Sequence, residues 1–202
     1  MTTVISGTSG ITFPAGGTGN PAGTVVGTTD SQTLTNKTIG SGYSGSTVTQ
    51  GTQVASTSGT SISFTGIPSW VKRITVLFNG VSLSSTSNFL FQIGSGSTDT
   101  SGYLSRSVAT GSAANVVGNS TAGIVLVSGD AGNLFYGAIN IYNISGNTWI
   151  FSGTFAATQG TSTFAIMTGG NHATSAALDR VVITTVSGTD TFDAGAINIQ
   201  YE

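Results

Sequence analysis

Serine, threonine and glycine make up 92 of the 202 residues, and they occur along the whole chain. All three are poor helix formers, and glycine is the poorest of them. The one stretch with helical character is His172–Leu178, whose three alanines are enough for a turn or two. The chain is therefore expected to build its regular structure almost entirely from strands.

Short apolar runs follow one another through residues 61–202, separated by turn-forming residues. The runs are Ser61–Phe64, Val71–Phe78, Phe89–Ile93, Ile124–Val127, Leu134–Ile144, Thr163–Met167 and Arg180–Val186. The turn signals include Asn79-Gly80, Ser145-Gly146-Asn147 and Gly169-Gly170. Many short strands with turns at intervals of roughly 8–12 residues are typical of an antiparallel sandwich or barrel. We predict an all-β fold: an antiparallel β-sandwich of jelly-roll-like type, preceded by an extended amino-terminal region.

The clearest strand pattern lies in residues 148–155. Trp149, Phe151 and Phe155 share one face of the expected strand, and hydroxyl residues occupy the other face. The last strand shows the same period, with three residues on one face: Ile197, Ile199 and Tyr201. These alternations predict strands with one face in the core.

The apolar content rises near residue 60. Residues 1–60 hold ten Leu, Ile, Val and Phe residues, whereas residues 61–202 hold forty. The first region alone cannot bury enough apolar surface to offset its chain entropy, so it is either a flexible tail or a segment that orders against other chains. We therefore divide the chain into an attachment or trimerisation region, 1–60, and a β-sandwich domain, 61–202. The apolar residues expected to make the attachment contacts are Val4, Ile5, Ile11, Phe13, Leu34 and Ile39.

Charge is scarce. Only 6% of the residues are charged, against roughly 25% in a typical globular chain. The five basic residues are scattered, so nucleic-acid binding is not expected. No window of about 18 apolar residues exists, so membrane insertion is not expected either. The chain has no Cys and shows no secretory signal at its amino terminus, which fits assembly in a reducing cytoplasm.

No catalytic constellation is visible in the sequence. The single histidine, His172, is either a loop residue with local hydrogen bonds or, in a trimer, one of three copies that hold a metal on the axis. Asp190 and Asp193 either bind Ca²⁺ or accept hydrogen bonds from backbone N–H groups in a turn. A glycosidase needs a carboxylate pair, and the only glutamate is Glu202. We expect no enzymatic activity and no cofactor.

Three aromatic residues are candidates for binding a neutral ligand such as a sugar. Sugar rings are bound by flat aromatic side chains together with neutral hydrogen-bonding groups. The candidates are Tyr103, Trp70 and Tyr142. Because a domain of this size needs aromatics inside, core placement is favoured for Trp70 and Trp149. Tyr103 lies in a polar stretch, so it is the best candidate for an exposed aromatic.

Several segments resemble a known class of proteins. Asp30–Ile39 reads DSQTLTNKTI, which is similar to the QTLTNKT element of tailed-bacteriophage tail fibres, spikes and related virion appendages. The opening, Val4–Pro14, looks like the amino-terminal start of many phage fibre proteins. Three further segments resemble a carboxy-terminal β domain of such proteins: Phe64–Ile74, Leu178–Thr185 and Thr189–Glu202. The resemblance covers most of the chain, and residues 79–170 match least.

The resemblance implies a non-enzymatic virion protein, made in the cytoplasm of the bacterial host and usually a homotrimer. Such a protein binds other virion proteins through its amino-terminal region, and its usual ligand is a host-surface glycan. Two roles remain open. The first is a short tail fibre or tail appendage that contacts the host surface. The second is a head fibre or capsid decoration protein that docks through residues 1–60.

Overall fold

The computed structural model describes residues 48–110, 116–128, 130–159 and 162–202. The chain divides into two units, Met1–Gly45 and Ser46–Glu202, and the described residues all belong to the second unit. The expected attachment residues and the DSQTLTNKTI element therefore lie outside the described residues. These attachment residues are Val4, Ile5, Ile11, Phe13, Leu34 and Ile39.

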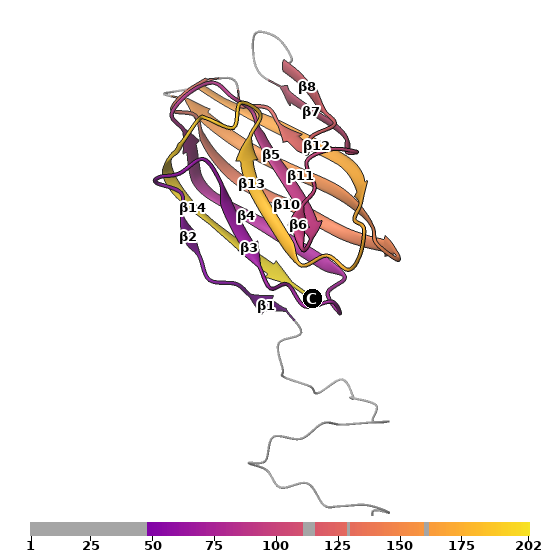
Figure 1. Cartoon of the computed structure of the whole chain (residues 1–202). Coiled ribbons are helices and arrows are strands. Elements are labelled where there is room, and N and C mark those ends of the chain that lie inside the picture. Colours follow the sequence, from indigo (N-terminus) through magenta and orange to yellow (C-terminus); the bar gives the residue numbers. More distant parts are fainter. Residues whose placement is uncertain (1–47, 111–115, 129, 160–161) are drawn as a thin grey trace, which may run out of the picture. The chain divides into compact units, whose positions relative to one another are not determined.

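The described residues form two antiparallel sheets (Figure 1). The larger sheet contains β1 (Thr49–Gln50), β2 (Val54–Ala55), β4 (Arg73–Leu83), β7 (Leu104–Thr110), β8 (Val116–Ser120), β10 (Leu134–Ser145), β11 (Thr148–Gln159), β12 (Ser162–Ala173) and β14 (Phe192–Tyr201). Its order is β1-β14-β4-β10-β11-β12-β7-β8, and β2 also pairs with β14. The smaller sheet contains β3 (Ile62–Thr65), β5 (Phe89–Ser95), β6 (Ser97–Thr98), β9 (Ile124–Leu126) and β13 (Arg180–Thr185). Its order is β3-β13-β5-β6, with β9 also on β5.

This architecture confirms the predicted all-β antiparallel sandwich, and no helix occurs among the described residues. The jelly-roll-like connectivity stays a prediction. The stretch His172–Leu178 is not helical: its first two residues end β12, and the others have no regular structure. The turn predicted at Ser145-Gly146-Asn147 is confirmed and forms a hairpin, because β10 and β11 pair directly across it.

Phenylalanine rings connect the two sheets. The ring of Phe78, on β4, lies 5.5 Å from that of Phe89 and 5.4 Å from that of Phe91, both on β5. Phe89 also contacts Phe135 of β10, with 5.0 Å between ring centroids and a nearly perpendicular geometry. Edge-to-face pairs of this kind are favourable beyond the area they bury. The core therefore lies between the sheets, and a cluster of aromatic rings lies within a mainly aliphatic set of side chains.

The predicted faces of β11 and β14 are confirmed. Trp149 and Phe151 are each 4% exposed and Phe155 is 2% exposed, so this face of β11 points into the core. Ile197 and Ile199 of β14 are buried in the same core. The alternation in the sequence thus identified the inward side chains of two strands.

Two glycine pairs expected to mark turns lie inside strands instead. Gly169-Gly170 belongs to β12, which continues to Ala173. A Cβ at Gly170 would lie 2.0 Å from the carbonyl oxygen of Leu104 on β7, so glycine is needed for close strand approach. Asn79-Gly80 lies within β4, where Gly80 has φ +66° next to a register shift against β14. Neither pair reverses the chain: Gly170 allows a close strand approach, and Gly80 accompanies an irregular ladder.

The sandwich begins before residue 61, so the domain boundary expected there needs correction. Both β1 and β2 pair with β14, and the N–H of Gly51 donates to the carbonyl of Ile199 at 2.8 Å. Ser56 is fully buried, and its hydroxyl donates to the carbonyl of Ala194 at 2.7 Å. The rise in apolar content near residue 60 did not reveal this segment, because the segment is held mainly by hydrogen bonds of its backbone and of a serine hydroxyl.

Hydroxyl groups close one side of the sandwich. The free edge of β9 faces the larger sheet, where the N–H of Val125 donates to the Ser105 hydroxyl at 2.7 Å. The Thr168 hydroxyl, on β12, donates to the carbonyl of Val125 at 2.5 Å. The N–H of Val127 donates to the Ser107 hydroxyl at 3.3 Å. Side chains of β7 and β12 thus take the place of a neighbouring strand for β9.

Trp149→Ala tests the core. Since Trp149 is buried on the inner face of β11, its truncation should lower the free energy of unfolding by roughly 3–5 kcal/mol. Val186→Ala is the control, because Val186 is 56% exposed and should cost less than about 1 kcal/mol. Urea unfolding of both variants measures the difference. Equal losses would contradict the assignment of the inner face.

A pair of shortened chains tests the corrected boundary. A chain that begins at Ser61 lacks β1, β2 and Ser56, so it exposes Ile199 and leaves the carbonyls of β14 without these partners. Compared with a chain that begins at Ser46, it should lose at least about 2 kcal/mol of unfolding free energy. The urea midpoint of each chain gives the answer. Identical midpoints would show that β1 and β2 are dispensable.

Candidate functional site

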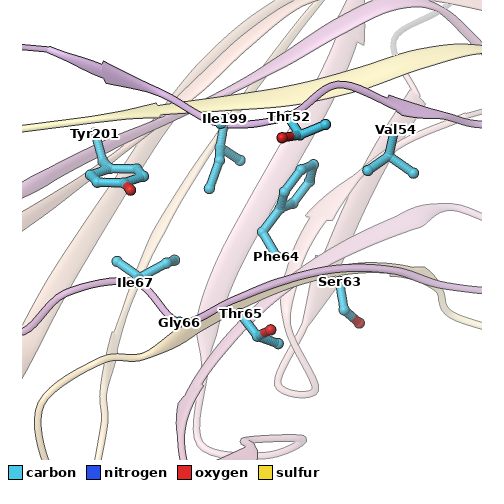
Figure 2. A pocket seen from close by; sticks show the side chains of 10 residues that line it. Thr52, Val54, Ser63, Phe64, Thr65, Gly66, Ile67, Ile199 and Tyr201 are labelled. Carbon is cyan, nitrogen blue, oxygen red and sulfur yellow. The ribbon is translucent and has the colours of Figure 1, made fainter.

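A groove opens at one side of the sandwich, between the edge strand β3 and the end of β14. Its volume is ≈ 300 Å³, and it is lined by Gly51, Thr52, Val54, Ser63, Phe64, Thr65, Gly66, Ile67, Ile199 and Tyr201. Figure 2 shows Phe64 and Ile67 reaching into the gap from one side, and Ile199 and Tyr201 from the other. The side chains of Ser63 and Thr65 point away from it. The groove therefore has an apolar floor and polar backbone along its walls.

An exposed tryptophan stands beside this groove. Trp70 is 57% exposed, and its ring lies 6.0 Å from that of Tyr201, tilted by 52°. It occupies a tight turn closed by a hydrogen bond from the N–H of Val71 to the carbonyl of Pro68. Both flanking apolar residues, Ile67 and Val71, are buried. The turn is therefore anchored on both sides, which leaves the indole ring facing solvent.

The end of β14 fixes the other half of the site. The N–H groups of Lys72 and Arg73 both donate to the carbonyl of Glu202, at 2.8 and 2.9 Å. The Arg73 guanidinium forms an ion pair of 2.6 Å with the Glu202 carboxylate. The two formal charges of this pair offset each other beside Tyr201. Neither group lines the groove, so a ligand there meets uncharged surface.

The arrangement suits a neutral ligand with both an apolar and a hydroxylated face. A volume of ≈ 300 Å³ is at the lower end for small-molecule sites. Aromatic rings offer flat apolar surface, while Thr52 and the backbone of β3 offer hydrogen-bonding groups. No group of three or more His, Cys, Asp or Glu side chains suited to a metal occurs in the described part of the chain.

The expectation that Tyr103 is exposed is wrong. Tyr103 is fully buried, and its hydroxyl accepts from the N–H of Ile93 at 2.8 Å. The same hydroxyl lies 3.1 Å from the carbonyls of Ile93 and Asp99. Because backbone carbonyls supply these acceptors, the phenol hydroxyl is satisfied inside the core although the residues around Tyr103 in the sequence are polar. Tyr103 is therefore not a surface platform for a ligand.

His172 packs on the Tyr103 ring. The two ring centroids are 3.8 Å apart and nearly parallel, and the Nε2 atom of His172 lies 2.9 Å from the Asp99 carboxylate. His172 is only 7% exposed and lies on β12, not in a loop. It therefore cannot present its ring to a metal on a trimer axis. Its partner, Asp99, was not identifiable from the sequence, because 73 residues separate them.

The Asp190 carboxylate accepts hydrogen bonds in a turn, as in the second of the two alternatives given for it. It accepts from the N–H of Ser87 at 2.8 Å and from the hydroxyl of Ser187 at 3.1 Å. These bonds join the turn before β14 to the loop after β4. Asp193 is exposed, whereas the Asp190 carboxylate is engaged within the chain.

The other aromatic residues considered in the sequence analysis lie in different parts of the sandwich. Trp70, expected in the core, is exposed because its turn projects from the sandwich. Tyr142 is partly exposed on the outer face of β10, opposite Arg73 and Ile150. Tyr201 was assigned only to the apolar face of the last strand. Its position at the very end of that strand was the one signal in the sequence that Tyr201 could lie at the edge of the groove.

The chain matches no protein-family model, and comparisons with the curated proteins and with the solved structures find no match. Among the described residues, no helix has the length and apolar character needed to cross a membrane.

Tyr103→Phe tests the buried cluster. Burial raises the pKa of the Tyr103 phenol well above its usual value, so the folded chain keeps this proton when the unfolded chain loses it. The wild type should therefore lose stability as the pH rises above about 10. At pH 7 the variant should lose about 1–3 kcal/mol, because the N–H of Ile93 loses its acceptor.

The difference between the two proteins should then shrink at higher pH, as measured by urea unfolding at several pH values. Tyr142→Phe is the control, since Tyr142 is partly exposed. Parallel pH profiles for wild type and Tyr103→Phe would contradict the role given to this phenol.

Proposed function

We propose that this protein is a bacteriophage virion structural protein, a homotrimeric short tail fibre or tail appendage that contacts a neutral glycan of the host surface. The observation that carries the proposal is the exposed Trp70 ring, held against Tyr201 beside an uncharged groove. The DSQTLTNKTI segment supports the assignment to a virion appendage by its resemblance. The protein is proposed to act by binding and assembly, not by catalysis.

The physical basis of recognition is stacking and neutral hydrogen bonding. A pyranose ring has one face of C–H groups, which fits the flat surface of an indole, and hydroxyl groups at its edge. Trp70 supplies the stacking surface, and the groove lined by Phe64 and Ile199 supplies apolar contact. Hydrogen bonds are available from Thr52 and from the exposed backbone of the edge strand β3.

Trp70→Ala tests this function. The variant should bind host cells roughly 30-fold more weakly than the wild type, which corresponds to about 2 kcal/mol for an aromatic anchor. Because Trp70 is largely exposed, thermal stability should change little. Trp70→Phe should keep part of the binding, and Val186→Ala, at an exposed site away from the groove, should keep all of it. Unchanged binding by Trp70→Ala would contradict the proposed site.

The salt dependence of the same assay tests the chemistry. Since the groove is uncharged, cell binding by the wild type should change less than about twofold between 50 and 150 mM salt, unlike a charge-driven contact. The control is binding of the wild type to purified capsids. If the protein binds capsids but ignores cells, the head fibre or capsid decoration role replaces the proposed one.

A further inference from the structure

The groove beside Trp70 carries unpaired peptide groups on two opposite walls. Gly66, which follows β3, lines one wall, and Thr52, which lies between β1 and β2, lines the other (Figure 2). Neither the backbone of these two residues nor the Thr52 hydroxyl forms a hydrogen bond with any other residue that the structure describes. The next N–H along the chain is used, because Ile67 donates to the carbonyl of Asp179 at 3.1 Å. Free amide donors and acceptors therefore face the groove.

The conformation of Gly66 keeps its peptide groups accessible. Its φ of +75° lies in the left-handed region that favours glycine, and no heavy atom lies within 4 Å of the place where a Cβ would stand. Ser63 and Thr65 also line the groove while their side chains point away, so they present their backbone to it. A ligand can therefore approach this wall as closely as a neighbouring strand would.

The floor of the groove has the opposite character. Phe64, Ile67 and Ile199 line it with side chains that belong to the buried core. A ligand hydroxyl placed over these side chains would lose its hydrogen bonds to water without gaining a partner. A methyl group in the same place would gain by burial. The groove thus favours a small group that joins a methyl to an amide-like donor and acceptor.

An acetamido group on a sugar meets these requirements. Its N–H and C=O have the hydrogen-bonding capacity of a peptide group, and its methyl suits the floor. None of the residues that line the groove is charged, which fits a neutral ligand. A volume of ≈ 300 Å³ suits one sugar ring better than a long peptide. The Trp70 ring stands beside Tyr201 at the same groove, where it can stack on the pyranose.

We propose that the groove beside Trp70 binds the acetamido group of a neutral N-acetylated hexosamine. Thr52 and the backbone at Gly66 bind the amide, and Phe64 and Ile199 contact the methyl group. The inference rests on the proposed function, in which Trp70 stacks on a glycan, and it names the class of sugar that the same site selects.

The test titrates the full chain with two matched pairs of sugars and follows tryptophan fluorescence. N-acetylglucosamine is compared with glucose, and N-acetylgalactosamine with galactose, because the members of each pair differ only in the acetamido group. In at least one pair the acetylated sugar should bind roughly tenfold more tightly, from a buried methyl and one amide hydrogen bond. Equal affinities within both pairs overturn the proposal. A 6-deoxyhexose that binds as tightly as the acetylated sugars also overturns it, since a methyl alone would then be sufficient.

A matched pair of variants tests the contact with the amide. Thr52→Val removes the hydroxyl at nearly constant shape, so the preference for the acetylated sugar should fall about threefold or more. Thr189→Val is the control, because Thr189 is also exposed but precedes β14, whereas the groove lies at the end of that strand. Circular dichroism checks that both variants fold. An unchanged preference in Thr52→Val overturns the proposal.

A peptide ligand is the alternative that the same titration excludes or supports. N-acetylalanine methylamide has a methyl and two peptide groups but no pyranose ring to stack on Trp70, so it should bind about tenfold more weakly than the acetylated sugar. Binding as tight as that of the sugar overturns the proposal in favour of a peptide.

The outcomes separate this inference from the proposed function. If both sugar pairs bind equally while Trp70→Ala still weakens cell binding, the acetamido site falls and the proposed function stands. If Trp70→Ala leaves cell binding unchanged while the acetylated sugar is preferred, the acetamido site stands and the host-contact role falls.

Discussion

The contact between Phe78 and the two phenylalanines of β5 holds the two sheets together, and the other features of the sandwich depend on it. Phe78 reaches both Phe89 and Phe91, and it also contacts Phe155 in its own sheet at 5.4 Å. A chain with 6% charged residues and little helical propensity has few other ways to gain stability. Aromatic rings bury more apolar area per residue than aliphatic side chains do, so a few of them support many small residues.

In this protein, serine and threonine hydroxyls form many of the side-chain hydrogen bonds to backbone groups that join one strand to another. Ser105 and Thr168 satisfy the open edge of β9, and Ser56 ties the first described strands to β14. A hydroxyl both donates and accepts, and burying it costs far less than burying an ion when its hydrogen bonds are made. The abundance of serine and threonine is therefore structural as well as a property of the surface. It also explains how the sandwich closes with few ion pairs among its described residues.

The scarcity of charge also shapes the proposed ligand site, because none of the residues that line the groove is charged. The groove beside Trp70 is lined by residues of both sheets. Multiple copies of one weak site raise the overall avidity when several contacts form at once.

The fold class and the inner faces of β11 and β14 followed from the sequence, because side-chain direction in a strand alternates strictly with residue number. Trp149, Phe151 and Ile199 were therefore identifiable as core residues. The tertiary structure alone decided which aromatics are exposed. Tyr103 is buried because Ile93 and Asp99 fold around its hydroxyl, and Trp70 is exposed because a tight turn carries it outward.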